Sequence, residues 1–371
     1  RLPEEAIRTY AYGLHARDGK TQEAIDMLSW LGSVYDESYQ VFYFLGAIAK
    51  EDGRKELSIF NYRKALEVGN MPPRMRTVIE RNLNEVSESQ SVLTLFGEGT
   101  LSTEKVDYGI AFTPDENVAY VVRHDGEWGS RVNPPSKIHR YVKKDEKWIN
   151  TGYADFSDKD SPWSDSGIFI SPNGELAFFV SNRPYQGKSG ESDPDIFMMT
   201  KNGDKWSKPS AVEALNSPGY EASPVTDKEG NIYFSSIRQE GLGLGDIYMS
   251  RVIGTGEYSK PELLEGSINS PSGEWNLIIS PDAEWIIFES SGRADGSSPY
   301  GDLYLSRKNT TGDWSEPTNL KALNTTGSDL NPRILYKSNK LVWASSQKLE
   351  HTGTDFFSLS LKEIEVNIKD N

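Results

Sequence analysis

Five acidic residues recur at nearly constant spacing in the part of the chain that follows residue 100. Each one precedes a short apolar stretch, and successive members lie 58, 56, 53 and 55 residues apart. We call them the opening acids: Asp107, Asp165, Glu221, Glu274 and Asp329. Carboxylates gathered at one site can bind a hard cation such as Ca²⁺, or they can exchange protons with a sugar substrate.

Each opening acid begins a repeated phrase, which is clearest from Glu221 to Pro261. The apolar stretch is followed by a polar turn, a β-rich run ending in Ser-Ser-x-Arg, a Gly-rich loop, Asp-Ile-Tyr and an aromatic-Ser-x-Pro. Four strand patterns in a period of this size predict a β-propeller. Five units predict five blades, and the residue count disfavours a sixth.

Two stretches and the segments that follow them resemble the PD40, or WD40-like, repeats of TolB-type propellers. They are SPNGELAFFVSNR, SPDAEWIIFESSGR and the Asp-Ile-Tyr and Trp-Ser-x-Pro segments that follow. The resemblance is greatest to copies in bacterial cell-envelope proteins, where helical repeats often precede the propeller. It covers about 270 residues. It implies a fold and no single activity, because such a fold hosts scaffolds, binding proteins and enzymes.

Strand direction places all five opening acids on one face of the predicted propeller, where they should surround the mouth of the central channel. Two further sets should lie on the same face. Arginines end the second strands, and aspartates begin the third strands. We expect each arginine to pair with the aspartate of its own blade. The arginines are Arg183, Arg238 and Arg293, and the aspartates are Asp195, Asp246, Asp302 and Asp355.

Five converging carboxylates repel one another unless a cation, protons or a ligand compensates the charge. The acids either hydrogen-bond the neighbouring blade or form a functional site. A site could hold Ca²⁺, or it could bind a glycan, a peptide or a cation-bearing partner together with the three arginines. Five-bladed glycosidases, which resemble this chain only in architecture, carry Asp, Asp and Glu on the first three inner strands. The first three opening acids, Asp107, Asp165 and Glu221, follow the same order, so they are the candidate catalytic residues under this alternative.

Aromatic and histidine side chains supply further candidates. Trp163 and Trp275 could stack on a sugar ring, although core packing explains them equally well. The first unit departs from the repeated phrase, since it lacks Ser-x-Arg and has Lys137-Ile138-His139 in place of Asp-Ile-Tyr. Its loop also contains His124, so His124 and His139 are candidate ligand-binding residues. No phosphate-binding or nucleophile motif is present.

Residues 1–90 show apolar positions at helical spacing, with Gly19, Gly53 and Gly69 where helices should stop. The stretch 39–70 resembles a tetratricopeptide repeat, and 6–34 resembles a weaker copy. The matching residues are Leu45, Gly46, Ser58, Tyr62 and Ala65. This domain either packs as a helical block or offers a peptide groove. Residues 91–371 form the propeller, which we expect strand 92–98 to close by pairing with the last blade.

The net charge of −15 opposes binding to nucleic acid and anionic lipid. There is no cysteine, and no apolar stretch is long enough to span a bilayer. The chain starts at Arg1 without Met, as it would after removal of a signal or lipid anchor and equally after trimming. The sequence therefore favours a non-catalytic binding or scaffold protein of the bacterial periplasm, outer membrane or exterior. The alternative is a glycoside hydrolase.

Overall fold

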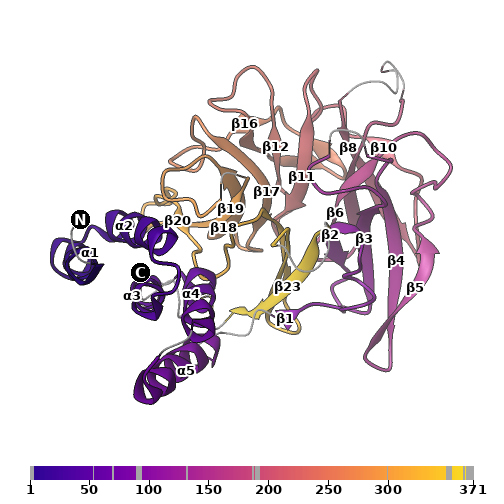
Figure 1. The fold of residues 1–371 in the computed structure, drawn as a ribbon. Helices are drawn as coiled ribbons and strands as arrows, with labels where there is room; N and C mark the ends of the chain where they lie inside the picture. Colours follow the sequence, from indigo (N-terminus) through magenta and orange to yellow (C-terminus); the bar gives the residue numbers. More distant parts are fainter. Residues whose placement is uncertain are drawn as a thin grey trace. The chain divides into compact units, whose positions relative to one another are not determined.

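The computed structural model describes residues 4–52, 54–68, 71–88, 94–130, 133–185, 188, 193–298, 300–347, 353–361 and 364. The chain divides into two compact units, Arg1–Val92 and Leu93–Asn371. The first is helical and the second is a five-bladed β-propeller (Figure 1).

The helical unit contains α1 (Glu4–Asp18), α2 (Thr21–Val34), α3 (Tyr39–Glu51), α4 (Lys55–Glu67) and α5 (Pro73–Glu88). Gly19 directly follows α1 with φ of +65°, a conformation that glycine adopts without steric cost. The other two predicted stop positions, Gly53 and Gly69, lie outside the described residues. Among the described helices, none is long and apolar enough to cross a membrane.

Each blade of the propeller is a four-stranded antiparallel sheet that runs outward from the channel. The inner strands β2, β6, β11, β17 and β21 surround the central axis (Figure 1). Blade 1 contains β2 (Val106–Phe112), β3 (Val118–His124), β4 (Lys137–Lys144) and β5 (Lys147–Tyr153); blade 2 contains β6 (Asp165–Ile170), β7 (Leu176–Ser181), β8 (Asp195–Asn202) and β10 (Ser210–Ala211).

The remaining blades repeat this order. Blade 3 contains β11 (Glu221–Thr226), β12 (Ile232–Ser236), β13 (Asp246–Ser250) and β16 (Glu262–Leu263); blade 4 contains β17 (Gly273–Ile279), β18 (Trp285–Ser291), β19 (Asp302–Arg307) and β20 (Thr318–Asn319); blade 5 contains β21 (Asp329–Leu335), β22 (Lys340–Ser345), β23 (Asp355–Ser360) and β1 (Thr94–Leu95). Large apolar side chains such as Phe178, Phe234, Phe288 and Trp343 fill the space between blades and are fully buried.

The ring closes through β1, which pairs with β23 so that Thr94 lies opposite Ser358. The Phe96 amide also donates a hydrogen bond of 2.7 Å to the Phe356 carbonyl. The outermost strand of the last blade therefore comes from the start of the propeller sequence, which covers an edge that would otherwise be free to aggregate.

The aromatic-Ser-x-Pro segments precede the outer strands, whereas we expected the outer strands to contain them. Two of the segments start in the short strands β9 (Lys205–Trp206) and β15 (Glu257–Tyr258), which pair with β8 and with β14 (Val252–Gly254). The serine oxygen accepts a backbone N–H at the end of the third strand, as Ser207 does from Thr200 at 3.0 Å. The proline then comes before the outer strand, where its missing N–H costs no ladder bond.

Every inner strand has a register shift one or two residues after its opening acid. In four of the five strands, the residue at the shift has a positive φ: Gly167 (57°), Ser223 (49°), Asn276 (43°) and Asn331 (51°). Left-handed backbone is strained for a residue with a side chain, and it re-aims the side chains that follow. The inner strands therefore present different faces to the channel before and after the shift.

Substitution of Phe96 by proline tests the closure. Proline removes the N–H that bonds the Phe356 carbonyl, which should cost about 1–3 kcal/mol and weaken the pairing of β1 with β23. We expect a lower melting temperature together with concentration-dependent oligomers in size-exclusion chromatography. Phe96→Ala is the matched control, because it removes side-chain contacts and keeps the backbone. Equal behaviour of the two variants would contradict a role for this backbone hydrogen bond.

Candidate active site in the central channel

The structure places all five opening acids inside the blades. Each of them is fully buried, so none presents an open carboxylate at the channel mouth. Glu221 shows the arrangement: it accepts hydrogen bonds from the Ser217 amide (3.1 Å) and hydroxyl (2.5 Å), and from the Ser236 hydroxyl (3.0 Å). Glu274 repeats these contacts with Ser270 and Ser290. The expected open ring of mutually repelling acids is thus replaced by separate internal contacts.

The arginines pair with the opening acids, and the predicted pairing with the third-strand aspartates is wrong. Arg183 contacts Asp165 at 2.6 Å, Arg238 contacts Glu221 at 3.2 Å and Arg293 contacts Glu274 at 3.0 Å. Each guanidinium also donates to a carbonyl of the segment that arrives from the preceding blade. The acceptors are the Phe156, Leu215 and Ile268 carbonyls. One arginine thus joins its own blade to the previous one.

Blade 1 has the same pairing, although its sequence lacks Ser-x-Arg. Arg123 lies within β3, forms a short ion pair with Asp107 and is itself buried. Its remaining donors reach the Tyr141 hydroxyl at 2.9 Å and the Thr100 carbonyl at 3.2 Å. The expectation that the first unit has no arginine partner is corrected, because Arg123 lies directly opposite the opening acid, where blades 2, 3 and 4 have Ser181, Ser236 and Ser290.

Blade 5 is the exception, since none of the arginines that the structure describes forms an ion pair with Asp329. The Asp329 carboxyl accepts a hydrogen bond from the Thr325 amide at 2.6 Å, and its Oδ1 has no partner. Burial without a counter-ion disfavours the charged form and raises the pKa of Asp329 to about 7. The opening acids therefore divide into four that are paired with arginine and one that holds a proton near neutral pH.

The third-strand aspartates hold the loops that precede them. Asp246 accepts hydrogen bonds from the Leu242 and Gly243 amides at 2.9 and 3.1 Å. Asp195 instead pairs with Lys188 at 2.7 Å. In blade 1 the equivalent residue is Lys137, whose ammonium donates to the carbonyls of Ser161 (3.0 Å) and Trp163 (2.7 Å). These residues stabilise the loops on the face where the inner strands begin.

An aromatic cluster lies next to these loops in blade 1. The Tyr108 ring lies 5.9 Å from the rings of both His124 and Trp128, and its hydroxyl donates to the Ser136 hydroxyl at 2.8 Å. His124 is buried, and its Nδ1 accepts the Gly126 amide at 3.0 Å. Burial lowers the pKa of His124. The structure therefore brings His124 to this cluster.

The other predicted aromatic and histidine residues are more dispersed. His139 packs against Tyr153 near the outer edge of blade 1, with ring centroids 4.4 Å apart, and burial lowers its pKa to about 4. Trp163 is half-buried, and its carbonyl accepts the Lys137 hydrogen bond. Trp275 belongs to a second cluster, in which its ring meets the Tyr220 ring edge-on at 5.9 Å.

Glu289 completes this second cluster, and the sequence interpretation missed it. It lies opposite Trp275 in the β17–β18 ladder and accepts a hydrogen bond from the Asn276 side-chain amide. It is 8% exposed, and burial raises its pKa to about 8. The nearby Asp329 carboxyl raises it further by repulsion. A single acid inside the apolar run Trp285–Ser291 was the available signal.

Tyr220 connects Glu289 to a second carboxylate. Burial raises the pKa of the Tyr220 phenol, and the charges of Asp193 and Glu289 both contribute to the rise. Asp193 is exposed, whereas Glu289 is buried. The charges of a buried carboxyl and of an exposed carboxyl therefore both act on Tyr220, whose ring contacts Trp275. Pairs of acids in different environments can divide acid and base roles between them.

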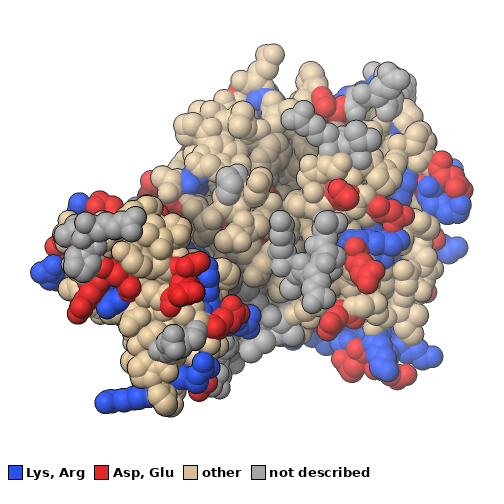
Figure 2. Space-filling model, in the orientation of Figure 1, with Lys and Arg blue, Asp and Glu red and all other residues tan. Residues whose placement is uncertain are grey.

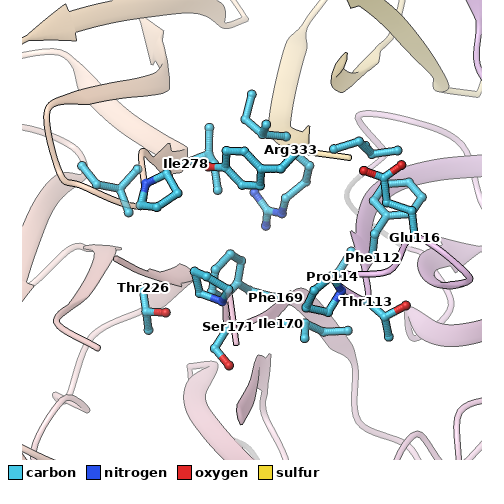
Figure 3. Close-up of a pocket in the computed structure, with 17 residues that line it drawn as sticks. Phe112, Thr113, Pro114, Glu116, Phe169, Ile170, Ser171, Thr226, Ile278 and Arg333 are labelled. Atoms are coloured by element: carbon cyan, nitrogen blue, oxygen red, sulfur yellow. The ribbon is translucent and has the colours of Figure 1, made fainter. Parts of the chain in front are cut away.

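The structure also has a cavity of about 350 Å³ at the opposite end of the channel (Figure 3). The last residue of every inner strand lines it: Phe112, Ile170, Thr226, Ile279 and Leu335. We expected the candidate sites at the other end of the channel. Arg333 projects into this cavity from β21 and is only 4% exposed. An arginine in the middle of an inner strand, after Pro332, was the signal for it.

Within the described residues, no group of three or more histidine or acidic side chains could hold a metal ion. The carboxyl oxygens of Glu221 and Glu274 accept hydrogen bonds from serine amides and hydroxyls, whereas Asp329 Oδ1 has no partner. On the face of the propeller seen in Figure 2, acidic and basic side chains lie interspersed, and large tan areas separate them.

No known family model matches the chain, and no curated protein sequence matches it. Similar solved structures include an endo-arabinase from Bacteroides thetaiotaomicron, which is 15% identical with a TM-score of 0.44 over 69% of this chain and 94% of the other. An alpha-L-arabinanase from Penicillium chrysogenum is 12% identical, with a TM-score of 0.41 over 71% and 99%. Prolyl oligopeptidase B from Galerina marginata is 11% identical, with a TM-score of 0.38 over 64% and 30%.

These comparisons correct the sequence-based preference for a non-catalytic binding or scaffold protein. Glycan-acting enzymes recur among the similar structures, including the two arabinanases and an exo-beta-1,3-galactanase from Clostridium thermocellum. They agree better with the glycoside-hydrolase alternative. At these identities and TM-scores the likeness shows the fold alone, so an activity must be argued from the residues of this chain.

Asp165→Asn tests the pairing between opening acids and arginines. The substitution keeps the shape of the side chain but leaves the Arg183 guanidinium without its counter-ion in a nearly buried position. Loss of one partner of a buried pair costs about 3–5 kcal/mol, so we expect a clear fall in the urea midpoint. Asp204→Asn, in the exposed turn before β9, is the control and should change stability by less than about 0.5 kcal/mol. A negligible effect of Asp165→Asn would contradict the structural role.

Asp329→Asn tests the unpaired acid by pH. A carboxyl whose pKa is about 7 when folded and about 4 when unfolded binds more protons in the native state over that range. The free energy of unfolding of the wild type should therefore fall as the pH rises from about 4 to 7. The asparagine variant lacks this contribution. Relative to the wild type it should gain stability between pH 5 and 8, on the order of 3 kcal/mol in urea unfolding. A pH-independent difference would contradict the assignment.

Proposed function

We propose that the chain is a glycoside hydrolase in which Glu289 is the proton donor. The observation behind this proposal is Glu289, a buried acid with a pKa of about 8 that lies opposite Trp275, together with the exposed Asp193, whose charge acts on Tyr220 as that of Glu289 does. A glycosidase needs one carboxyl that is protonated at neutral pH and one that is ionised. The opening acids Asp107, Asp165 and Glu221 are poorly suited to these roles, because their oxygens are buried against arginine and serine or threonine groups.

In the proposed reaction, the glycosidic C–O bond breaks while the leaving oxygen takes the proton of Glu289. Asp193 accepts a proton from a water molecule, and the oxygen of that water bonds to the anomeric carbon. Solvent then returns the proton from Asp193 to Glu289. Tyr220 and Trp275 provide aromatic surfaces for the apolar face of a sugar ring. The Asn276 amide holds the Glu289 carboxyl in place.

The experiment measures reducing ends released from arabinan and β-1,3-galactan, which are the substrate types of the similar solved structures. Glu289→Gln keeps the hydrogen bond to Asn276 and removes the proton, so it should lower kcat by about 10²–10⁴-fold. Asp193→Asn should reduce turnover comparably. Activity of the wild type should decline as the pH rises through about 8, because Glu289 then loses its proton.

Asp204→Asn is the control variant and should retain wild-type activity. Circular dichroism melts of all variants separate loss of activity from loss of fold. Turnover by Glu289→Gln at the wild-type rate would remove Glu289 from the mechanism. Absence of sugar release by the folded wild type on the whole panel would contradict the proposed hydrolase activity on these substrates.

For the helical unit we propose tetratricopeptide-like packing. A Cβ at Gly46 would lie 2.7 Å from the Tyr62 ring, and the Ser58 hydroxyl donates to the Gly46 carbonyl at 2.7 Å. Residues at the repeat positions therefore fix the approach of α3 and α4. The PD40 type of the propeller, a glycan partner and a location in the envelope or exterior of a bacterium belong to the same proposal. Secretion of substrate-degrading activity into the medium would support that location.

A further inference from the structure

The cavity at the end of the channel where the inner strands finish has a wall that is mostly apolar. Phe112, Phe169, Ile278 and Leu335 contribute to it, and the described charged residues that line it are Arg333 and Glu116. Its volume of about 350 Å³ lies within the range of small-molecule sites. None of the residues that line this cavity belongs to the cluster around Glu289, so ligand binding here is independent of the proposed hydrolase activity.

Arg333 is buried at this cavity without a counter-ion. None of the ion pairs found among the described residues includes it, and burial alone lowers the pKa of its guanidinium to about 10. Backbone carbonyls hold the group in place. Nη1 donates to the Leu277 and Pro332 carbonyls at 3.2 and 2.8 Å, and Nη2 donates to the Ile168 carbonyl at 3.4 Å.

These contacts use three of the five N–H donors of the guanidinium. Nε is buried with no hydrogen-bond partner, and one N–H of Nη2 is left as well. Nε and Nη2 form one edge of the planar group, and two parallel N–H bonds from such an edge match the two oxygens of a carboxylate. The Thr226 hydroxyl is also buried without a partner, and Thr226 lines the same cavity.

Glu116, the other charged residue of the cavity, does not neutralise Arg333. Its Oε1 accepts the Lys337 and Ser338 amides at 2.7 and 3.0 Å, which ties the first turn of blade 1 to the turn between β21 and β22. The cavity therefore contains one uncompensated positive charge, one unpartnered hydroxyl and an apolar wall. A buried cation with spare donors is costly unless an anion pairs with it.

We propose that this cavity binds a small carboxylic acid with an apolar body, whose carboxylate pairs with the guanidinium of Arg333. The apolar body lies against the phenylalanine, isoleucine and leucine side chains. A short-chain fatty acid has the required size and charge. Phosphate and sulfate fit less well, since both lack a group that would cover the apolar wall.

The test is isothermal titration calorimetry of the full chain with hexanoate, hexanamide and acetate. Hexanoate should bind at least tenfold more tightly than hexanamide, because hydrogen bonds to a charged group contribute about 1.5–3 kcal/mol. It should also bind more tightly than acetate, which has almost no apolar body. Equal affinities for hexanoate and hexanamide, equal affinities for hexanoate and acetate, or no binding of hexanoate, would overturn the proposal.

Two variants assign the site. Arg333→Met keeps an apolar chain and removes the fork, so hexanoate binding should disappear. Arg333→Lys keeps a positive charge and removes the planar fork, so hexanoate affinity should fall about threefold to tenfold. If Arg333→Met does not fold, the comparison of hexanoate with hexanamide on the wild type decides, and equal affinities overturn the proposal. Ser210→Ala, on the outer strand of blade 2, is the control and should bind as the wild type does.

Discussion

The buried pair of an opening acid and an arginine is the interaction on which the blades depend. The acid begins the inner strand, the arginine ends or follows the second strand, and the guanidinium reaches a carbonyl of the segment arriving from the blade before. A charge that is buried in this way costs free energy unless its partner and its hydrogen bonds are in place. Each pair therefore specifies two things at once, which are the register of its own blade and the attachment to its neighbour.

The same physics explains why blade 5 differs from the other four. Without an arginine, the buried Asp329 carboxyl is more stable in its neutral form. Its negative charge, when it is ionised, raises the pKa of Glu289 in blade 4. The part of the channel near these two acids is thus the place where protons are held near neutral pH. At the other end, the channel contains a cation, Arg333, whose donors are only partly used. The propeller therefore buries weak acids toward one end of its inner strands and a guanidinium cation toward the other.

Much of the fold follows from sequence periodicity. Five repeats of four strand patterns predicted five blades, and regular spacing of the opening acids marked the inner strands correctly. The partners of those acids could not be predicted in the same way. Arg183 lies nearer in sequence to Asp195 than to Asp165. Because the second strand runs antiparallel to the first, however, Arg183 lies beside Asp165 at the start of the first strand. The pairing depends on three-dimensional strand order and on the arriving linker, which spacing alone does not show.

The candidate sites were harder to predict because repetition draws attention to what every blade shares. Residues that every blade shares build blades, as the opening acids do. Glu289 and Arg333 each occur once, at positions where the other blades carry apolar or small residues. Their significance comes from burial and from missing partners, and neither property can be read from residue type. His124, which lies beside Tyr108, was singled out from the sequence because its unit departs from the repeat.

The pairing of β1 with β23 has a consequence for how the protein is made. The strand that completes the last blade leaves the ribosome before any other part of the propeller, and its partner leaves last. The ring cannot close until nearly the whole chain has been synthesised, so blades 1 to 4 must persist as an open arc during that time. A chain that stops short of β23 would leave the β1 segment without its pairing partner. Closure therefore acts as a check of completeness, and truncated chains should be recognised by quality-control proteases through their unpaired edges.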